Sequence, residues 1–105
     1  STRLPRAIRD VYKRQAYSFA RTAVLNALAA VHAEVGLENV VRVLKVVGYV
    51  ASAPDFFGQP AVINGASELI GDIFGESGAH VRSAVGVAVL PLNAPVEVEL
   101  VVEVR

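Results

Sequence analysis

The sequence predicts an α+β fold, a two-layer sandwich in which two helices cover one face of a mixed β-sheet. Two observations carry this prediction. Residues 16–35 and 58–74 repeat apolar residues at helical spacing, whereas residues 40–52, 82–89 and 96–104 are rich in valine and two of these three alternate with period two. The expected order is therefore helix, strand, helix, strand, strand, in one domain with one core.

Residues 1–15 differ from the rest and are predicted to form a basic leader outside a domain of residues 16–105. The leader holds five basic residues and one acidic residue, a net charge of +4, and the remainder holds five basic and nine acidic residues. Without strand alternation, the leader is expected to be disordered or foreign to the fold. The alternative is a basic arm that binds nucleic acid or an anionic surface, which the acidic remainder does not support.

The first predicted helix covers residues 16–35 and is followed by Gly36, a residue that readily ends a helix in a left-handed conformation. Its apolar positions recur at three- and four-residue spacing, and few of its residues are polar. A helix of this kind is expected to be covered on more than one side. The residues that define the repeat are Ala20, Ala23, Ala27, Leu28 and Val31.

The segment 40–52 is predicted to be a strand, because six of its residues are valine. Its nearly continuous apolarity favours a central place in the sheet over an edge. A break at residues 53–55 and a proline at Pro60 then introduce the second helix, since proline is favoured in a first helical turn. That helix is expected to bury Val62, Ile63, Ala66, Leu69, Ile70, Ile73 and Phe74, and to expose Asn64, Ser67, Glu68 and Asp72.

The last two strands are predicted to pair as a hairpin with Leu90 near Val96, their valines facing the helices. The opposite face would then carry Arg82, Ala84, Gly86 and Ala88 beside Glu97, Glu99 and Glu103. This shallow charged face is interpreted as a small-molecule pocket anchored by one guanidinium, or else as solvated surface. In such a hairpin Arg82 and Glu97 would lie roughly 20 Å apart at ~3.3 Å per residue, so a shared site would take them from different subunits.

Composition excludes several classes of site and location. There is no cysteine, which removes disulfides, thiolate nucleophiles and cysteine metal sites. His32 and His80 stand alone, so no metal site is expected. The mean hydropathy is +0.46, yet no apolar run approaches the ~20 residues of a membrane span, and no signal-peptide core is visible. We therefore expect a cytoplasmic protein with extra apolar surface for an oligomer interface and with no membrane or nucleic-acid partner.

Residues 15–104 resemble the RidA/YjgF family (Rid, L-PSP endoribonuclease-like). The C-terminal signature HVRSAVGVAVLPLNAPVEVE of residues 80–99 is the most specific match. Shorter matches are AVLNAL at 23–28, VVGYVASAPDF at 46–56, VINGAS at 62–67 and FG at 74–75. The resemblance implies a chorismate mutase-like fold and a homotrimer with clefts between subunits that bind small carboxylates.

The resemblance also implies an activity, the hydrolysis of reactive 2-imino or 2-enamino acids to 2-keto acids and ammonia without metal or cofactor. This is the reaction of a 2-iminobutanoate/2-iminopropanoate deaminase, and it would require the trimer to assemble. The family arginine that binds the substrate carboxylate falls on Arg82, and the family glutamate that positions water or ligand falls on Glu97. Ala84 and Asn64 complete the expected substrate contacts, although Asn64 could instead be an exposed polar residue.

Two departures from the family pattern stand out. Family members begin with a strand hairpin that contributes pocket residues, and residues 1–15 do not resemble it. Residues 16–105 therefore resemble a truncated family domain that lacks the N-terminal strand hairpin. The cysteine often found two residues after the arginine is Ala84 here. Two other functions stay open beside the hydrolase. One is a non-catalytic trimer that binds small carboxylates or a protein partner. The other is a ribonuclease, which the net negative charge of residues 16–105 disfavours.

Overall fold

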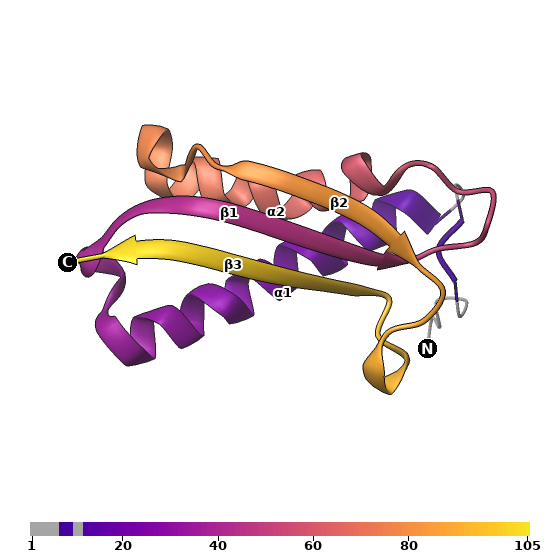
Figure 1. Cartoon of the computed structure of the whole chain (residues 1–105), viewed down its shortest axis with the longest axis horizontal. Helices are drawn as coiled ribbons and strands as arrows, with labels where there is room; N and C mark the ends of the chain where they lie inside the picture. The colour runs from indigo at the N-terminus through magenta and orange to yellow at the C-terminus, as the bar shows by residue number, and fades with distance from the viewer. Residues whose placement is uncertain (1–6, 10–11) are drawn as a thin grey trace.

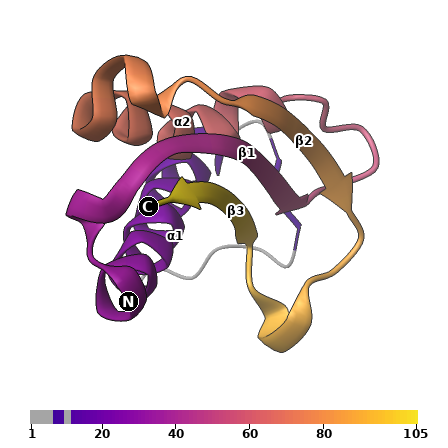
Figure 2. The same cartoon turned by 60° about the vertical axis from the view of Figure 1, so that its left-hand side comes forward.

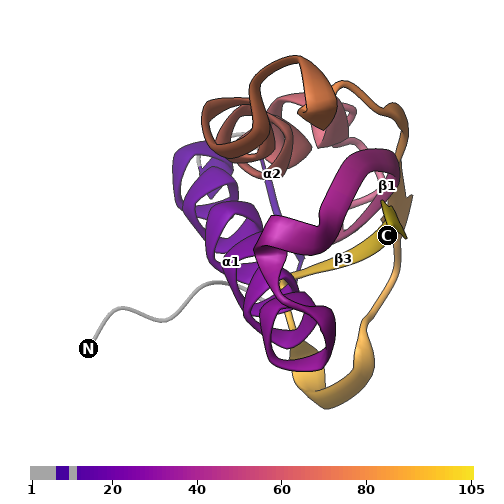
Figure 3. The ribbon, with the colours of Figure 1, turned by 90° about the vertical axis from the view of Figure 1, so that its left-hand side faces the viewer.

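The computed structural model of the chain describes residues 7–9 and 12–105. Its main elements are helix α1 (Lys13–Val35), strand β1 (Val40–Ala51), helix α2 (Gln59–Phe74), strand β2 (Val81–Val87) and strand β3 (Val96–Val104). Both helices cover one face of a three-stranded sheet, as the end view in Figure 3 shows. The predicted two-layer α+β fold is confirmed. In the described part of the chain, no helix is long and apolar enough to cross a membrane.

Strand β1 lies in the centre of the sheet, between β2 and β3 (Figure 1). It pairs in parallel with β2 and antiparallel with β3. The crossover through α2 makes the β1–β2 pair parallel, because parallel neighbours need a long connection. The central position predicted for this valine-rich segment is confirmed, and Val43, Val46 and Val50 are almost completely buried.

The helices pack on the sheet through small and branched side chains. Helix α1 buries residues at four-residue spacing, Ala16, Ala20, Val24 and Leu28. Helix α2 buries Val62, Ile63, Gly65, Ala66, Leu69 and Ile70, close to the predicted set, although Ile73 is exposed. Figure 2 shows both helices lying against the same side of the curved sheet.

The predicted hairpin of β2 with β3 is wrong, because β1 separates the two strands. The predicted face of β2 is wrong as well. The registers place Arg82, Val46 and Leu100 in one row, and Ala84, Gly48 and Val98 in the next row on the same face. That face is turned toward the helices, since Val46, Ala84, Val98 and Leu100 all belong to or pack against the core.

The physical reason for the reversed face is the close approach of α2 to the sheet. A Cβ on Gly48 would stand 2.3 Å from Ile63 Cδ1, and one on Gly86 would stand 2.7 Å from the Gln59 amide nitrogen. A small residue is therefore required at Gly48, directly under the helix, and the Gln59 side chain lies over Gly86. The β2 valines face away from the helices, on the open face of the sheet, where Val85 shares a row with Tyr49 and Glu97. Alternation locates a strand but does not say which face a helix covers.

The N-terminal segment joins the domain more closely than predicted. Helix α1 begins at Lys13, three residues before the expected start. Ile8 is fully buried and forms an isolated parallel bridge with Ser52. These contacts place residues 8 and 13–15 within the packed domain. Residues 1–6, 10 and 11 of the predicted leader lie outside the described part of the chain, and the expected disorder of these residues stays a prediction.

Candidate functional site

The structure brings Arg82 of β2 together with Asn64 of α2. The Arg82 Nη1 donates a hydrogen bond to Asn64 Oδ1 at 2.7 Å and a longer one to Ser67 Oγ at 3.3 Å. Asn64 and Ser67 are three residues apart and therefore lie on the same side of the helix. Because β2 runs beside α2, the two acceptors hold the guanidinium against the helix at the edge of the sheet.

This arrangement leaves one edge of the Arg82 guanidinium available. A guanidinium carries five N–H groups, and the two on Nη1 are directed to Asn64 and Ser67. The Nε and Nη2 groups have no hydrogen-bond partner among the described residues, and the side chain is exposed. The Nε–H and Nη2–H pair forms the planar fork that binds a carboxylate through two charge-assisted hydrogen bonds.

His80 continues the same hydrogen-bond network beyond Ser67. Its Nδ1 lies 2.6 Å from the Gly78 carbonyl oxygen, and its Nε2 lies 2.9 Å from Ser67 Oγ. A carbonyl oxygen can only accept, so Nδ1 carries the hydrogen in this pair. In the neutral imidazole Nε2 is then an acceptor, and the Ser67 hydroxyl donates to it while accepting from Arg82.

Ala84 and Glu97 occupy different places relative to this cluster. Ala84 lies two residues along β2 from Arg82, on the same helix-facing side, and packs partly against the core. Glu97 is exposed on β3 and pairs with Tyr49, whose row lies on the open face of the sheet. Arg82, Ala84 and Asn64 are thus brought together, whereas Glu97 is not. The expectation that Glu97, Glu99 and Glu103 share a face with Arg82 is wrong.

The separation of Arg82 and Glu97 has a different geometry from the one expected. Arg82 stands opposite Val46 and Glu97 opposite Tyr49, an offset of three β1 residues or about 10 Å along the strand. The estimate of roughly 20 Å rested on a hairpin that does not form. The two side chains nevertheless leave opposite faces of the sheet, so they do not meet within one chain.

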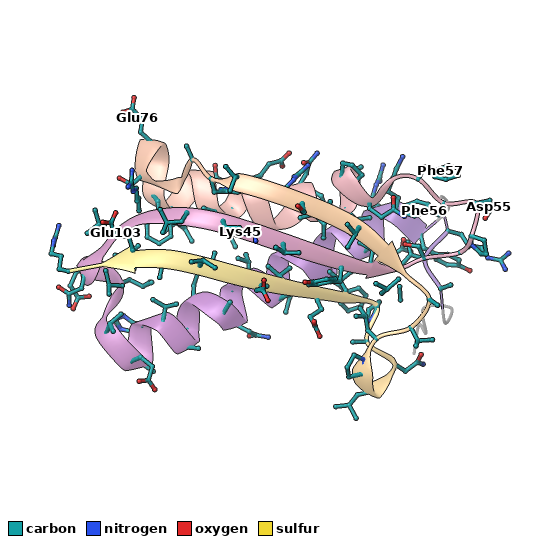
Figure 4. All side chains as sticks on the ribbon, viewed as in Figure 1. Lys45, Asp55, Phe56, Phe57, Glu76 and Glu103 are labelled. Atoms are coloured by element: carbon teal, nitrogen blue, oxygen red, sulfur yellow. The ribbon has the colours of Figure 1, made fainter. Side chains whose placement is uncertain are left out.

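A hollow lies near the end of β2 that is farther from Arg82. It has a volume of about 380 Å³ and is bordered by the loop between β1 and α2, which carries Phe56 and Phe57 (Figure 4). Gln59 spans part of its wall by donating to Ser52 Oγ and to the Phe56 carbonyl. Neither the loop nor Gln59 was among the predicted site residues. In the described ranges no group of three or more acidic or imidazole side chains could hold a metal ion.

Ser67 and His80 are the site residues that sequence reasoning missed. Ser67 was assigned to the polar face of a helix, and His80 was considered only as a metal ligand. Two signals in the chain point to them. Ser67 follows Asn64 at helical spacing, and His80 precedes Arg82 at strand spacing, so each neighbours a predicted site residue on one face.

Comparison with known proteins assigns the chain to a family. A family profile described as YjgF/chorismate mutase-like, putative endoribonuclease matches residues 7–104. A curated relative, protein TCP17 of Trypanosoma cruzi, is 47% identical over 88 residues, which cover 82% of this chain and 55% of the relative. The chain thus spans about half the length of this relative.

Two solved structures share the fold. The protein Atu1372 of Agrobacterium tumefaciens, described as having unknown function, matches with a TM-score of 0.91 and 45% identity. The match covers 94% of this chain and 65% of that protein. A protein of Shewanella oneidensis described as a putative endoribonuclease matches with a TM-score of 0.84 and 31% identity, over 88% of this chain and 62% of that one.

Proposed function

The chain belongs to the YjgF/chorismate mutase-like family, and on that basis we propose that it acts as a Rid-type hydrolase of small imino acids. The substrates are 2-imino and 2-enamino acids, and the products are 2-keto acids and ammonia. The observation that carries the proposal is the braced guanidinium of Arg82, whose Nε and Nη2 edge is directed away from its partners on α2. Each proposed substrate carries the carboxylate that this edge fits.

The proposed reaction needs binding, a placed water and proton transfer. The imine carbon lies next to the carboxylate, so holding the carboxylate fixes the carbon for attack by water. Water adds to the C=N carbon and gives one proton to the nitrogen. The proton of the new hydroxyl group then moves to the same nitrogen, and the C–N bond breaks to release ammonia and leave the C=O group. A carboxylate beside the water assists this transfer, and Glu97 is the residue we propose for that role.

Because Glu97 is proposed to act on the substrate that Arg82 binds, the proposal requires a site that is shared between copies of the chain. Arg82 and Glu97 leave opposite faces of the sheet, so one chain does not present both to a single substrate. A neighbouring copy would supply Glu97 to the Arg82 of the first. We therefore propose that the site lies between subunits of a homotrimer.

The test of the hydrolase is ammonia release from an imino acid formed in the assay by an amino-acid oxidase. The chain is expected to accelerate release above the spontaneous rate, and Arg82→Ala should lower this acceleration by at least about tenfold. Arg21→Ala is the matched control, because Arg21 is an exposed arginine on α1, in the helical layer. Equal activity of Arg82→Ala and the unaltered chain would refute the role of Arg82.

A non-catalytic carboxylate binder is the second candidate, because the same guanidinium edge would bind a small carboxylate without any reaction. In that case the chain binds a 2-keto acid and Arg82→Ala does not, yet ammonia release stays at the spontaneous rate.

The endoribonuclease named in the family description is the third candidate function. Residues 16–105 carry nine acidic and five basic residues, a poor match for RNA phosphates. RNA cleavage that survives Arg82→Ala would favour this reading.

A further inference from the structure

Three polar side chains behind the free edge of Arg82 form a directed chain of hydrogen bonds. Arg82 donates to Ser67 at 3.3 Å, Ser67 pairs with His80 Nε2 at 2.9 Å, and His80 Nδ1 pairs with the Gly78 carbonyl at 2.6 Å. With the His80 imidazole neutral and its hydrogen on Nδ1, each group in this order donates to the next one. Since aligned hydrogen bonds polarise one another, the Ser67 oxygen becomes a better acceptor for Arg82.

We infer that Ser67 and His80 are positioning residues, which fix the orientation of the Arg82 guanidinium and so its affinity for a carboxylate. This inference rests on the proposed role of Arg82 as the carboxylate anchor. Neither residue would touch the substrate. Both would act by fixing the orientation of the guanidinium plane.

The need for a second acceptor follows from the geometry of the guanidinium. With Asn64 alone, Nη1 is held at one point and the planar group can still turn about that hydrogen bond. Ser67 supplies a second point from the next turn of α2, and two points fix the direction in which the Nε and Nη2 fork faces. A fork fixed before the ligand arrives loses less entropy on binding.

His80 makes Ser67 suitable for this task. A serine hydroxyl can donate as well as accept, and its hydrogen rotates freely. Because His80 Nε2 takes that hydrogen, the hydroxyl presents a lone pair to Arg82 rather than a competing hydrogen. The imidazole is fixed in turn by the Gly78 carbonyl, and Gly78 is buried so tightly that a Cβ there would stand 2.8 Å from the Ile70 carbonyl oxygen.

The experiment compares the binding of 2-oxobutanoate, a carboxylate, with that of its uncharged methyl ester by NMR titration of the full chain. Ser67→Ala and His80→Phe should each weaken binding of the carboxylate about five- to tenfold and leave the ester unchanged. Ser67→Thr keeps the hydroxyl and His80→Gln keeps an acceptor, so both should bind within about threefold of the unaltered chain. Ser77→Ala is the matched serine control, since Ser77 is an exposed residue of the turn before β2.

The outcomes separate this inference from the proposed function. If Arg82→Ala abolishes carboxylate binding but Ser67→Ala binds as the unaltered chain does, the positioning role is refuted and the anchor stands. If Arg82→Ala binds normally, the anchor itself is refuted. An equal loss in Ser67→Ala and Ser67→Thr, or a loss that extends to the ester, would mean general structural damage and would also overturn the inference.

Discussion

The residues beside Arg82 determine which of its N–H groups can bind a ligand. A lone arginine on an exposed edge strand would be an ordinary surface charge, with its five donors shared among water molecules. Here Asn64 and Ser67 take the Nη1 donors and leave the Nε and Nη2 edge for a ligand. Asn64 is neutral, so it orients the guanidinium without cancelling its positive charge.

The neutrality of Asn64 can be tested with a substitution that keeps its shape. Asn64→Asp places a carboxylate where the amide oxygen lies 2.7 Å from Arg82 Nη1 and creates an ion pair. We expect affinity for 2-oxobutanoate to fall at least about tenfold, which is ~1.4 kcal/mol, because the new carboxylate competes with the ligand. Thermal stability should not fall, which thermal unfolding will check.

The control for this variant is Asn26→Asp on α1, where an exposed asparagine gains the same charge away from the site. Affinity should then stay within about twofold, since a distant exposed charge is screened. Unchanged affinity in Asn64→Asp would mean that Asn64 does not influence the anchor.

Sequence reasoning identified part of this site and could not identify the rest. Arg82 and Asn64 were both chosen, and the structure brings them together. Ser67 and His80 each share a face with a chosen residue, but the sequence does not show that these two faces meet, so both residues were missed. Glu97 was placed on the same face as Arg82 because the valines of β2 were taken to face the helices, and alternation alone does not reveal which face of a strand a helix covers.

At the scale of elements, the contact between α1 and α2 depends on Gly65. A Cβ at this position would stand 2.2 Å from the Tyr17 carbonyl oxygen, which belongs to the backbone of α1 and cannot easily move. The two helix backbones therefore approach more closely here than any larger residue permits. Both helices are held at the spacing from which α2 can present its polar side to β2.

Gly65→Ala should accordingly destabilise the fold, although alanine favours helices. We expect a loss of about 1–3 kcal/mol in the free energy of unfolding, measured by denaturant titration, because the added methyl pushes the helices apart. Gly71→Ala is the matched control in the same helix, since nothing lies within 4 Å of its Cβ position. That variant should gain about 0.5–1 kcal/mol from helix propensity. A neutral or stabilising Gly65→Ala would contradict the close packing.

The same two helices are joined at their surface by a hydrogen bond from the Tyr17 hydroxyl to the Glu68 carboxylate. This hydrogen bond, with smaller contributions from desolvation and from the charge of Glu68, raises the pKa of Tyr17 above its usual value near 10. A raised pKa in the folded state means that the folded chain holds the phenolic proton more tightly than the unfolded chain. The stabilisation is therefore complete below pH 10 and is lost as the pH rises through the folded-state pKa.

Comparison of Tyr17→Phe with the unaltered chain tests whether the ionisation of Tyr17 affects stability. The unaltered chain should unfold at a higher temperature at pH 8, and the difference should shrink as the pH rises above 10. Tyr12→Phe serves as the control, because the Tyr12 hydroxyl has no hydrogen-bond partner in the described part of the chain. A difference between Tyr17→Phe and the unaltered chain that is independent of pH would show that ionisation of Tyr17 is not involved.

The elements themselves were largely predictable from local patterns. Helix α2 and strand β3 were placed to within a residue or two, and the central position of β1 followed from its unbroken apolarity. The register and the face of β2 could not be predicted, because both of its faces carry residues that tolerate burial. Alanine and glycine on one face suit a close helix, and valine on the other suits any apolar surface.

At the scale of the whole molecule, the sheet has one covered and one open face. The helices cover one face, while the open face carries Val81, Val85 and Val101, which are 68%, 41% and 43% exposed. Val81 and Val101 flank Lys45 in one row, and the glutamates of β3 lie at the margin. Exposed valines on a sheet face are costly for a monomer, and a surface shared between copies would remove them from water.

We therefore expect this open face to form the contacts of the proposed homotrimer. Light scattering of the unaltered chain should give about three times its mass of 11.1 kDa. Val85→Glu should shift that mass to the monomer, because a charge buried between subunits without a partner is strongly unfavourable. The same variant should lose ammonia release, since it would separate Arg82 of one chain from Glu97 of another.

Ile73→Glu is the control for this change, because Ile73 is 45% exposed, much like Val85, but lies on α2 in the helical layer. It should leave both the mass and the activity unaltered. A Val85→Glu chain that is still trimeric would show that the open face is not the contact surface. A monomeric Val85→Glu chain that still releases ammonia would show that Arg82 works without a neighbouring subunit, and the role of Glu97 would then have to be abandoned.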